Sequence, residues 1–169
     1  GTFGFIDLSL PHRIAAFGAS PDTQFALVFK APFDCELNDI SFSAAPTNAI
    51  TGAELRVYSD PLGTPGLMAS KSIEQFTSLA GNQALYISST FNGVNFTKDS
   101  YYALSMYQPL VQVNFYRFLN FGAGFEDLRK GTFLGTDWAL ATSPLDGSLF
   151  TLDTTRLPMM SFSLKSITD

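Results

Sequence analysis

Residues Ala53 to Ala69 read A-E-L-R-V-Y-S-D-P-L-G-T-P-G-L-M-A, a stretch that predicts a β-strand, a rigid turn and a second β-strand. Leu55 and Val57 alternate with polar or aromatic neighbours, which is the period of a half-buried strand. The turn follows because Pro61 removes a backbone N–H group and the nearby glycines tolerate positive φ angles. Leu67 begins the second strand. The rest of the chain can be ordered around this unit.

Short alternating stretches of the same kind run along most of the sequence. Thr23 to Ala31 places large apolar residues at every second position. Cys35 to Ser43 predicts another strand, with a bulge at Asn38-Asp39 because the apolar positions change face there. Pro144 to Gly147 predicts a tight turn. Phe121 to Gly131 is the only stretch in which a short helical turn fits.

These patterns predict an all-β fold class, an antiparallel β-sandwich that is jelly-roll-like, with about nine or ten strands and at most one short helix. A chain of 169 residues is expected to hold one such domain. We expect residues 1–16 to form an N-terminal extended arm or edge strand and residues 17–169 to form the single β-sandwich domain.

The first ten residues are apolar, and Asp7 is their only charge. Two roles are open for this arm. It can dock onto a neighbouring subunit by adding a strand to an open sheet edge, or it can be the first edge strand of its own sheet. In the first case the assembly contact consists of Phe3, Phe5, Ile6, Leu8 and Leu10.

Composition narrows the classes of partner. Charged residues make up 15% of the chain, against about 25% in typical soluble domains, so part of the apolar surface is expected to face another protein. The formal net charge of −5 argues against nucleic acid and anionic membranes as partners. No apolar run approaches the length of about 18 residues that a membrane helix needs.

Residue types that carry catalysis are scarce. His12 is the only histidine and Cys35 the only cysteine, whereas metal sites and catalytic triads need several such groups together. Cys35 is expected to be a buried structural thiol. We therefore predict no enzymatic activity, no catalytic residue, no metal site and no cofactor. Asp60 has the chemistry to bind a structural Ca²⁺, but turn formation alone explains this residue.

Two segments carry a resemblance to a known family. Val57-Tyr58-Ser59-Asp60 with the Gly-x-Pro-Gly sequence at residues 63–66 resembles the centre of the β-sandwich module in bacterial surface proteins of the "choice-of-anchor" type. Residues 94–104 keep the next element of that module, with Asp99 in place of a glycine and Tyr102 in place of a tryptophan. The module is similar to jelly-roll carbohydrate-binding modules, so the resemblance implies a surface location and glycan binding.

Two function classes follow. The first is a non-enzymatic structural or assembly module of a surface or virion particle, of the capsid decoration, tail or spike type, which binds itself or neighbouring structural subunits. The alternative is an extracellular carbohydrate-binding module, in which an aromatic ring stacks on a sugar and a carboxylate accepts its hydroxyl protons. The residues expected to bind the glycan are Trp138, Asp137, Tyr58, Tyr101 and Tyr107. Either class places the protein on a virion or at an extracellular or cell surface.

Overall fold

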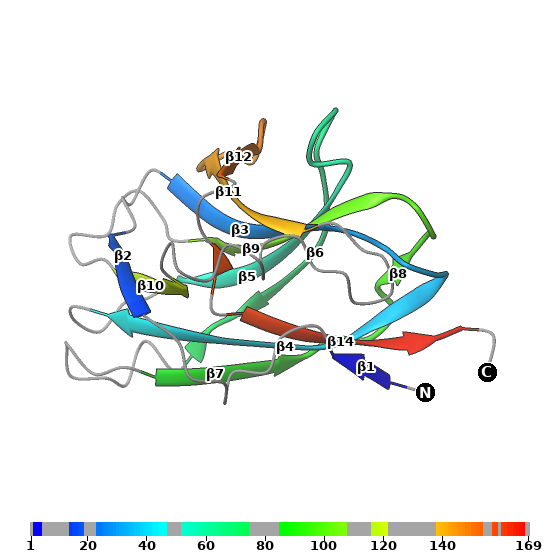
Figure 1. Cartoon of the computed structure of the whole chain (residues 1–169), viewed down its shortest axis with the longest axis horizontal. Coiled ribbons are helices and arrows are strands. Elements are labelled where there is room, and N and C mark those ends of the chain that lie inside the picture. The colour runs from blue at the N-terminus through cyan, green and yellow to red at the C-terminus, as the bar shows by residue number, and fades with distance from the viewer. Residues whose placement is uncertain are drawn as a thin grey trace.

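The computed structural model describes residues 2–4, 14–18, 23–46, 52–74, 85–107, 116–121, 138–153, 157–158 and 160–167. These residues form two antiparallel β-sheets and contain no α-helix. Figure 1 shows the sheets as two layers, with β4, β7 and β14 in the lower layer and β3, β5, β9 and β11 in the upper one. The predicted antiparallel β-sandwich is therefore confirmed. The helical turn expected at Phe121 to Gly131 lies outside the described residues, apart from Phe121 itself.

The upper sheet has six strands in the order β12-β11-β3-β9-β5-β6. The strands are β3 (Thr23–Lys30), β5 (Glu54–Ser59), β6 (Gly66–Ser72), β9 (Tyr101–Tyr107), β11 (Trp138–Pro144) and β12 (Thr151–Asp153). The hairpin of β5 and β6 is the strand, turn and strand that residues 53–69 predict. In the turn, Asp60 Oδ2 accepts a hydrogen bond from the Thr64 N–H group at 2.9 Å.

The lower sheet has eight strands and contains the longest strand described, β4 (Cys35–Pro46). Its other strands are β1 (Thr2–Gly4), β2 (Ile14–Gly18), β7 (Leu85–Thr90), β8 (Asn95–Phe96), β10 (Tyr116–Phe121), β13 (Leu157–Pro158) and β14 (Met160–Ser166). Between β4 and β14, Ser163 pairs with Asp39 and Leu164 pairs with Leu37, which leaves Asn38 unpaired. This is the bulge that the change of apolar face predicts.

The N-terminal residues that the structure describes pair within the chain. Strand β1 is antiparallel to β14, with Phe3 opposite Leu164, and lies at one end of its sheet. Strand β2 crosses the expected boundary at residue 16 and pairs with β10. The remaining residues of the expected assembly contact, Phe5, Ile6, Leu8 and Leu10, lie outside the described residues, so contact of the arm with a neighbour stays a prediction.

The main core lies between the two sheets. Phe29 of β3 is fully buried, and its ring centroid lies 4.5 Å from that of Phe162 on β14 and 5.4 Å from that of Phe96 on β8. Aromatic pairs at these separations add to the free energy gained from burying apolar area. The sheets are therefore joined by a ring cluster from three strands that are distant in the sequence.

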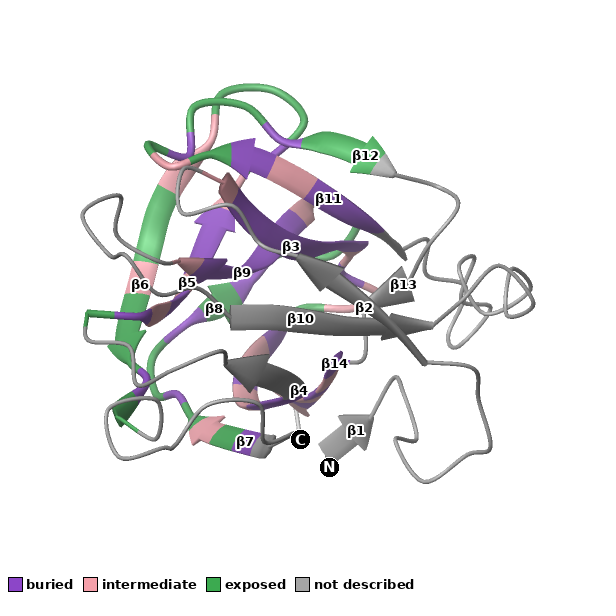
Figure 2. Cartoon of the chain, turned by 90° about the vertical axis from the view of Figure 1, so that its left-hand side faces the viewer, coloured by how far each residue is buried: buried purple, intermediate pink, exposed green. Residues whose placement is uncertain are grey.

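The outer face of the six-stranded sheet is also buried along its centre. Every residue of β3 from Gln24 to Phe29 is buried, although the alternation in sequence indicates a single buried face. Figure 2 shows the contrast between the buried central strands β3, β9 and β11 and the mainly exposed outer strands β6 and β12. A second, smaller apolar cluster lies on this face and consists of Ala26, Val28, Tyr58, Ala103, Ala141 and Phe150, with Tyr101 packed against it.

Candidate functional site

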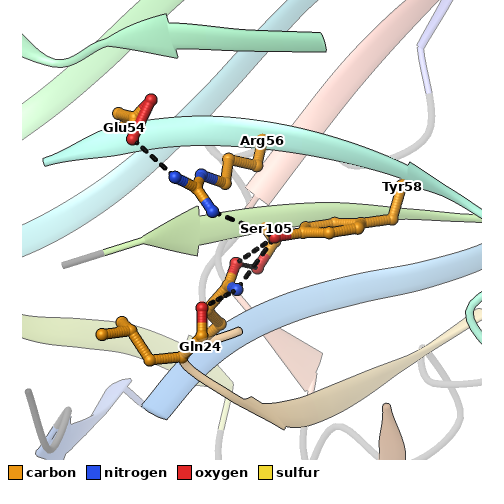
Figure 3. Close-up of polar contacts among 6 residues, drawn as sticks. Gln24, Glu54, Arg56, Tyr58 and Ser105 are labelled. Atoms are coloured by element: carbon orange, nitrogen blue, oxygen red, sulfur yellow. Dashed lines mark hydrogen bonds and ion pairs between the residues drawn. The ribbon is translucent and has the colours of Figure 1, made fainter. Parts of the chain in front are cut away.

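A buried polar network lies on the outer face of the six-stranded sheet (Figure 3). Gln24 stands at its centre: the amide Nε2 donates to the Tyr58 hydroxyl and to the Leu145 carbonyl oxygen, both at 2.9 Å. The amide Oε1 accepts a hydrogen bond from Ser105 Oγ at 2.9 Å. Gln24 and Ser105 are fully buried, and burial of such groups is tolerated because they are hydrogen-bonded. The network therefore holds three strands and one turn together.

Arg56 extends the network toward solvent. Its Nη2 atom forms an ion pair with Glu54 at 2.9 Å, and its guanidinium carbon lies 3.6 Å from the centroid of the Tyr107 ring. Burial by itself lowers the pKa of Arg56, but the hydrogen bonds to Tyr58 and Glu54 outweigh that effect and raise it above the usual value. Arg56 therefore stays charged. Its Nε atom is buried and has no hydrogen-bond partner among the described residues.

The turn at residues 144–147 closes over this face. The predicted turn is confirmed: the Gly147 N–H group donates to the Pro144 carbonyl at 2.9 Å, and Gly147 adopts a φ of 69°. After the turn, the chain brings Phe150 onto Tyr58, with ring centroids 5.1 Å apart. Tyr58 is consequently enclosed between its own sheet and the segment that follows β11.

A hollow of about 370 Å³ opens where β5 ends and β9 begins. Ser59, Asp60 and Leu62 line one side, and Ser100, Tyr101 and Tyr102 line the other. A second, wider groove of about 660 Å³ lies beside β6 and β7 and is lined mainly by serine and threonine hydroxyls, with Lys71 and Glu74. Lys71 is held there because its ammonium donates to the Thr90 carbonyl at 2.6 Å.

The structure brings the three tyrosines of the expected glycan site to one face of the six-stranded sheet. Tyr58 is 3% exposed and packed in the outer cluster, and Tyr107 lies beneath the Arg56 guanidinium. Tyr101 is half-buried and lines the hollow.

The structure describes less of the other two residues of the expected glycan site, Asp137 and Trp138. Asp137 lies outside the described residues. The backbone of Trp138 begins β11 opposite Phe29, and Phe29 is opposite Tyr102, so Trp138 lies at the same end of the sheet as the hollow.

Sequence reasoning missed Gln24 and Ser105 as members of a buried network. Both occupy positions that alternate with the apolar core residues, which by itself indicates a solvent-facing side chain. No local signal marks their burial, because the Leu145 carbonyl that contacts Gln24 is 121 residues further along the chain. Ser59 and Ser100 of the hollow were also missed: both lie within the two segments that carry the family resemblance, but neither was assigned to the expected glycan site.

His12, the only histidine in the sequence, lies outside the described residues. Within the residues that the structure describes, no three His, Cys, Asp or Glu side chains gather in a way that could hold a metal ion. That same part of the chain contains no helix long and apolar enough to cross a membrane. The Asp60 carboxylate forms a hydrogen bond inside its own turn, as the turn interpretation of this residue requires.

Cys35 is a free, fully buried thiol on β4. Burial, with a smaller contribution from the negative charge of Asp34, raises the pKa of Cys35 to about 12. Because only the thiolate is nucleophilic, we expect the native protein to react very slowly with Ellman's reagent at pH 8, and the guanidinium-unfolded protein to react at once with one equivalent. Rapid labelling of the native protein would contradict this expectation.

The raised pKa of Cys35 makes the protein less stable at high pH. An unfolded cysteine ionises near pH 8.5, well below the native pKa, so the unfolded state loses its proton first as the pH rises. The stability due to the buried neutral thiol is therefore complete below about pH 8.5 and falls by about 1.4 kcal/mol per pH unit above it, toward pH 12. Cys35→Ala removes this slope and serves as the control in urea titrations at pH 8 and pH 10.

Comparison with known proteins identifies no relative. No family model matches the sequence, and neither a curated protein nor a solved structure matches the chain. The resemblance to choice-of-anchor modules therefore rests on the two sequence segments at residues 57–66 and 94–104 alone.

Proposed function

We propose that this chain is a non-enzymatic structural module that assembles through protein–protein contacts in a surface or virion particle. The observation that carries the proposal is the pair of exposed edges of the six-stranded sheet. In the described part of the chain, β6 and β12 are the outermost strands of that sheet, and both expose large apolar side chains. The partners are further copies of this chain or neighbouring structural subunits, at an extracellular, cell or virion surface.

The edge formed by β6 has the chemistry of a contact surface. Leu67 is 54% exposed and Met68 is 39% exposed, and the edge backbone offers hydrogen-bonding groups to an added strand. A lysine on an edge strand commonly discourages such pairing. In β6, however, the Lys71 ammonium is engaged in a hydrogen bond to the Thr90 carbonyl. The opposite edge exposes Leu152 in β12. Burial of these side chains in a contact would remove apolar area from water.

The proposal predicts that the purified protein associates through β6. Replacing Leu67 and Met68 together by lysine adds two charges to the edge, so we expect the wild-type oligomer to dissociate to monomer in sedimentation velocity. Ile167→Lys is the control, because Ile167 is about as exposed as Leu67 but directly follows β14 of the other sheet. A wild-type protein that stays monomeric at high concentration, or an edge variant that associates like the wild type, would contradict the proposal.

A second candidate function, extracellular carbohydrate binding, is favoured by the hollow between β5 and β9. This hollow combines the half-buried ring of Tyr101, the carboxylate of Asp60 and the hydroxyls of Ser59 and Ser100. Sugar-binding sites use the same set of groups, with a ring for the apolar face of the sugar and polar groups for its hydroxyls. The two functions are compatible, since Leu67 and Met68 do not line the hollow.

A further inference from the structure

We propose that the hollow at the end of β5 and the start of β9 binds a single saccharide ring, with Tyr101 as the stacking surface and Asp60 as the hydroxyl acceptor. This inference rests on the second candidate function and assigns its site. The hollow lies within the described residues 59–62 and 100–102, which are the end of β5 with the turn after it and the start of β9 with the residue before it. Ser59 is directly opposite Tyr102 in the pairing of β5 with β9, so both walls are fixed by backbone hydrogen bonds.

The backbone around the hollow has an uncommon conformation on both sides. Among the described residues, Asp60 and Asp99 are the two non-glycine residues with positive φ, at 47° and 68°. Asp60 lines the hollow, and Asp99 immediately precedes Ser100, which also lines it. Such conformations persist where the surrounding structure enforces them, and they gather at ligand-binding positions. The positions of the two walls are therefore set before any ligand arrives.

The turn holds the Asp60 carboxylate in place. Its Oδ2 atom accepts the Thr64 N–H at 2.9 Å, and a Cβ atom placed on Gly63 would approach both carboxylate oxygens to 2.7 Å. The carboxylate is thus close to the turn backbone, with little room to move toward Gly63. A carboxylate fixed in this way can accept a hydrogen bond from a sugar hydroxyl with a small entropic penalty.

The rings on the opposite wall are also fixed. Tyr101 packs against the outer apolar cluster but keeps part of its surface open to the hollow. Tyr102 is 6% exposed, and its hydroxyl accepts the Thr97 N–H at 2.8 Å. The open part of Tyr101 is therefore the aromatic surface that a ligand would meet, and the exposed Leu62 also lines the hollow.

The size and charge of the hollow favour one sugar ring over other ligands. Its volume of about 370 Å³ is at the small end of the range of about 300–1,000 Å³ for ligand pockets. An ammonium group would also find a ring and a carboxylate here, but the other polar side chains that line the hollow are the neutral hydroxyls of Ser59 and Ser100. The Ser100 hydroxyl can both donate to and accept from sugar hydroxyls, and Ser59 Oγ, which donates to the Gly66 carbonyl at 3.3 Å, can still accept from them. An ammonium can only donate, so it would leave the donor capacity of Ser100 unused.

The test begins with the labelled full chain on a glycan array, followed by titration calorimetry with the monosaccharide and disaccharide units of the glycans that bind. Tyr101→Ala removes the stacking ring and is expected to reduce affinity to below detection. Asp60→Asn keeps the turn acceptor and tolerates positive φ but removes the charge, so we expect about a tenfold loss of affinity. Asp99→Asn is the matched control: it has the same backbone conformation, does not line the hollow and should bind like the wild type.

The possible results test the carbohydrate function, the assigned site and the class of ligand separately. If the wild type binds no glycan, both the carbohydrate function and this site are wrong. If the wild type binds and the Tyr101 and Asp60 variants bind equally well, the function holds and the assigned site is wrong. If Nα-acetyl-lysine methyl ester saturates the hollow and no saccharide does, the ligand is an ammonium and the proposal fails. Thermal unfolding of each variant, with sedimentation velocity, separates loss of binding from loss of fold or of assembly.

Discussion

The Phe29→Ala variant is expected to unfold with a free energy about 3–5 kcal/mol lower than that of the wild type. Phe29 is fully buried, and its ring contacts Phe96, Tyr102 and Phe162 from three other strands. Truncation removes those contacts and leaves a cavity between the sheets, which rigid strand pairing prevents from closing. Urea denaturation followed by circular dichroism measures the change.

Two controls accompany the Phe29 measurement. Phe29→Leu keeps most of the buried volume and is expected to lose less than half as much stability. Leu152→Ala removes a side chain that is 41% exposed and should change the stability by less than about 1 kcal/mol. If Phe29→Ala were as stable as Leu152→Ala, Phe29 would not be part of a close-packed core between the sheets.

The Gly147→Ala variant is expected to lose about 2–4 kcal/mol of stability from two causes that act together. Gly147 has a φ of 69°, a conformation that strains a residue with a Cβ atom. The added Cβ would also lie 2.7 Å from the Tyr58 ring, which cannot move away because it is packed against Phe150 and hydrogen-bonded to Gln24. For a chain of this length the melting temperature should fall by about 2–4 °C per kcal/mol.

Gly93 provides the matched control for Gly147. It has a similar φ of 74°, but a Cβ atom added there meets nothing within 4 Å. Gly93→Ala therefore reports the backbone strain alone, about 1–2 kcal/mol. A double-mutant cycle of Gly147→Ala with Tyr58→Ala isolates the steric part, because removal of the ring removes the clash. If Gly147→Ala and Gly93→Ala lost the same stability, the Cβ atom added at residue 147 would not clash with Tyr58.

The sequence by itself determined the local elements of this protein. The alternation of Leu55 and Val57, followed by the proline and glycines of the turn, specified a strand, a turn and a second strand. The odd spacing of apolar residues around Asn38 specified the bulge, because a one-residue shift moves every later side chain to the other face. These features depend on residues within a few positions of one another, so they can be read locally.

The candidate sites were predicted less completely. Tyr58, Tyr101 and Tyr107 were expected to lie in one region, and strand pairing does place them on one face of the six-stranded sheet. Their separate environments could not be predicted, because the exposure of each ring depends on what packs over it. Phe150 covers Tyr58 and Arg56 covers Tyr107, whereas Tyr101 borders the hollow.

Only the tertiary structure decided which polar residues are buried and where a ligand can enter. The sequence pattern of β3 indicates an outward-facing Gln24, yet Gln24 is fully buried because a turn 121 residues later covers it. The walls of the hollow likewise come from two strands whose pairing brings Ser59 opposite Tyr102. Alternation along one strand reports that strand's two faces, but the covering of each face depends on long-range contacts that are formed only when the sheets and turns pack together.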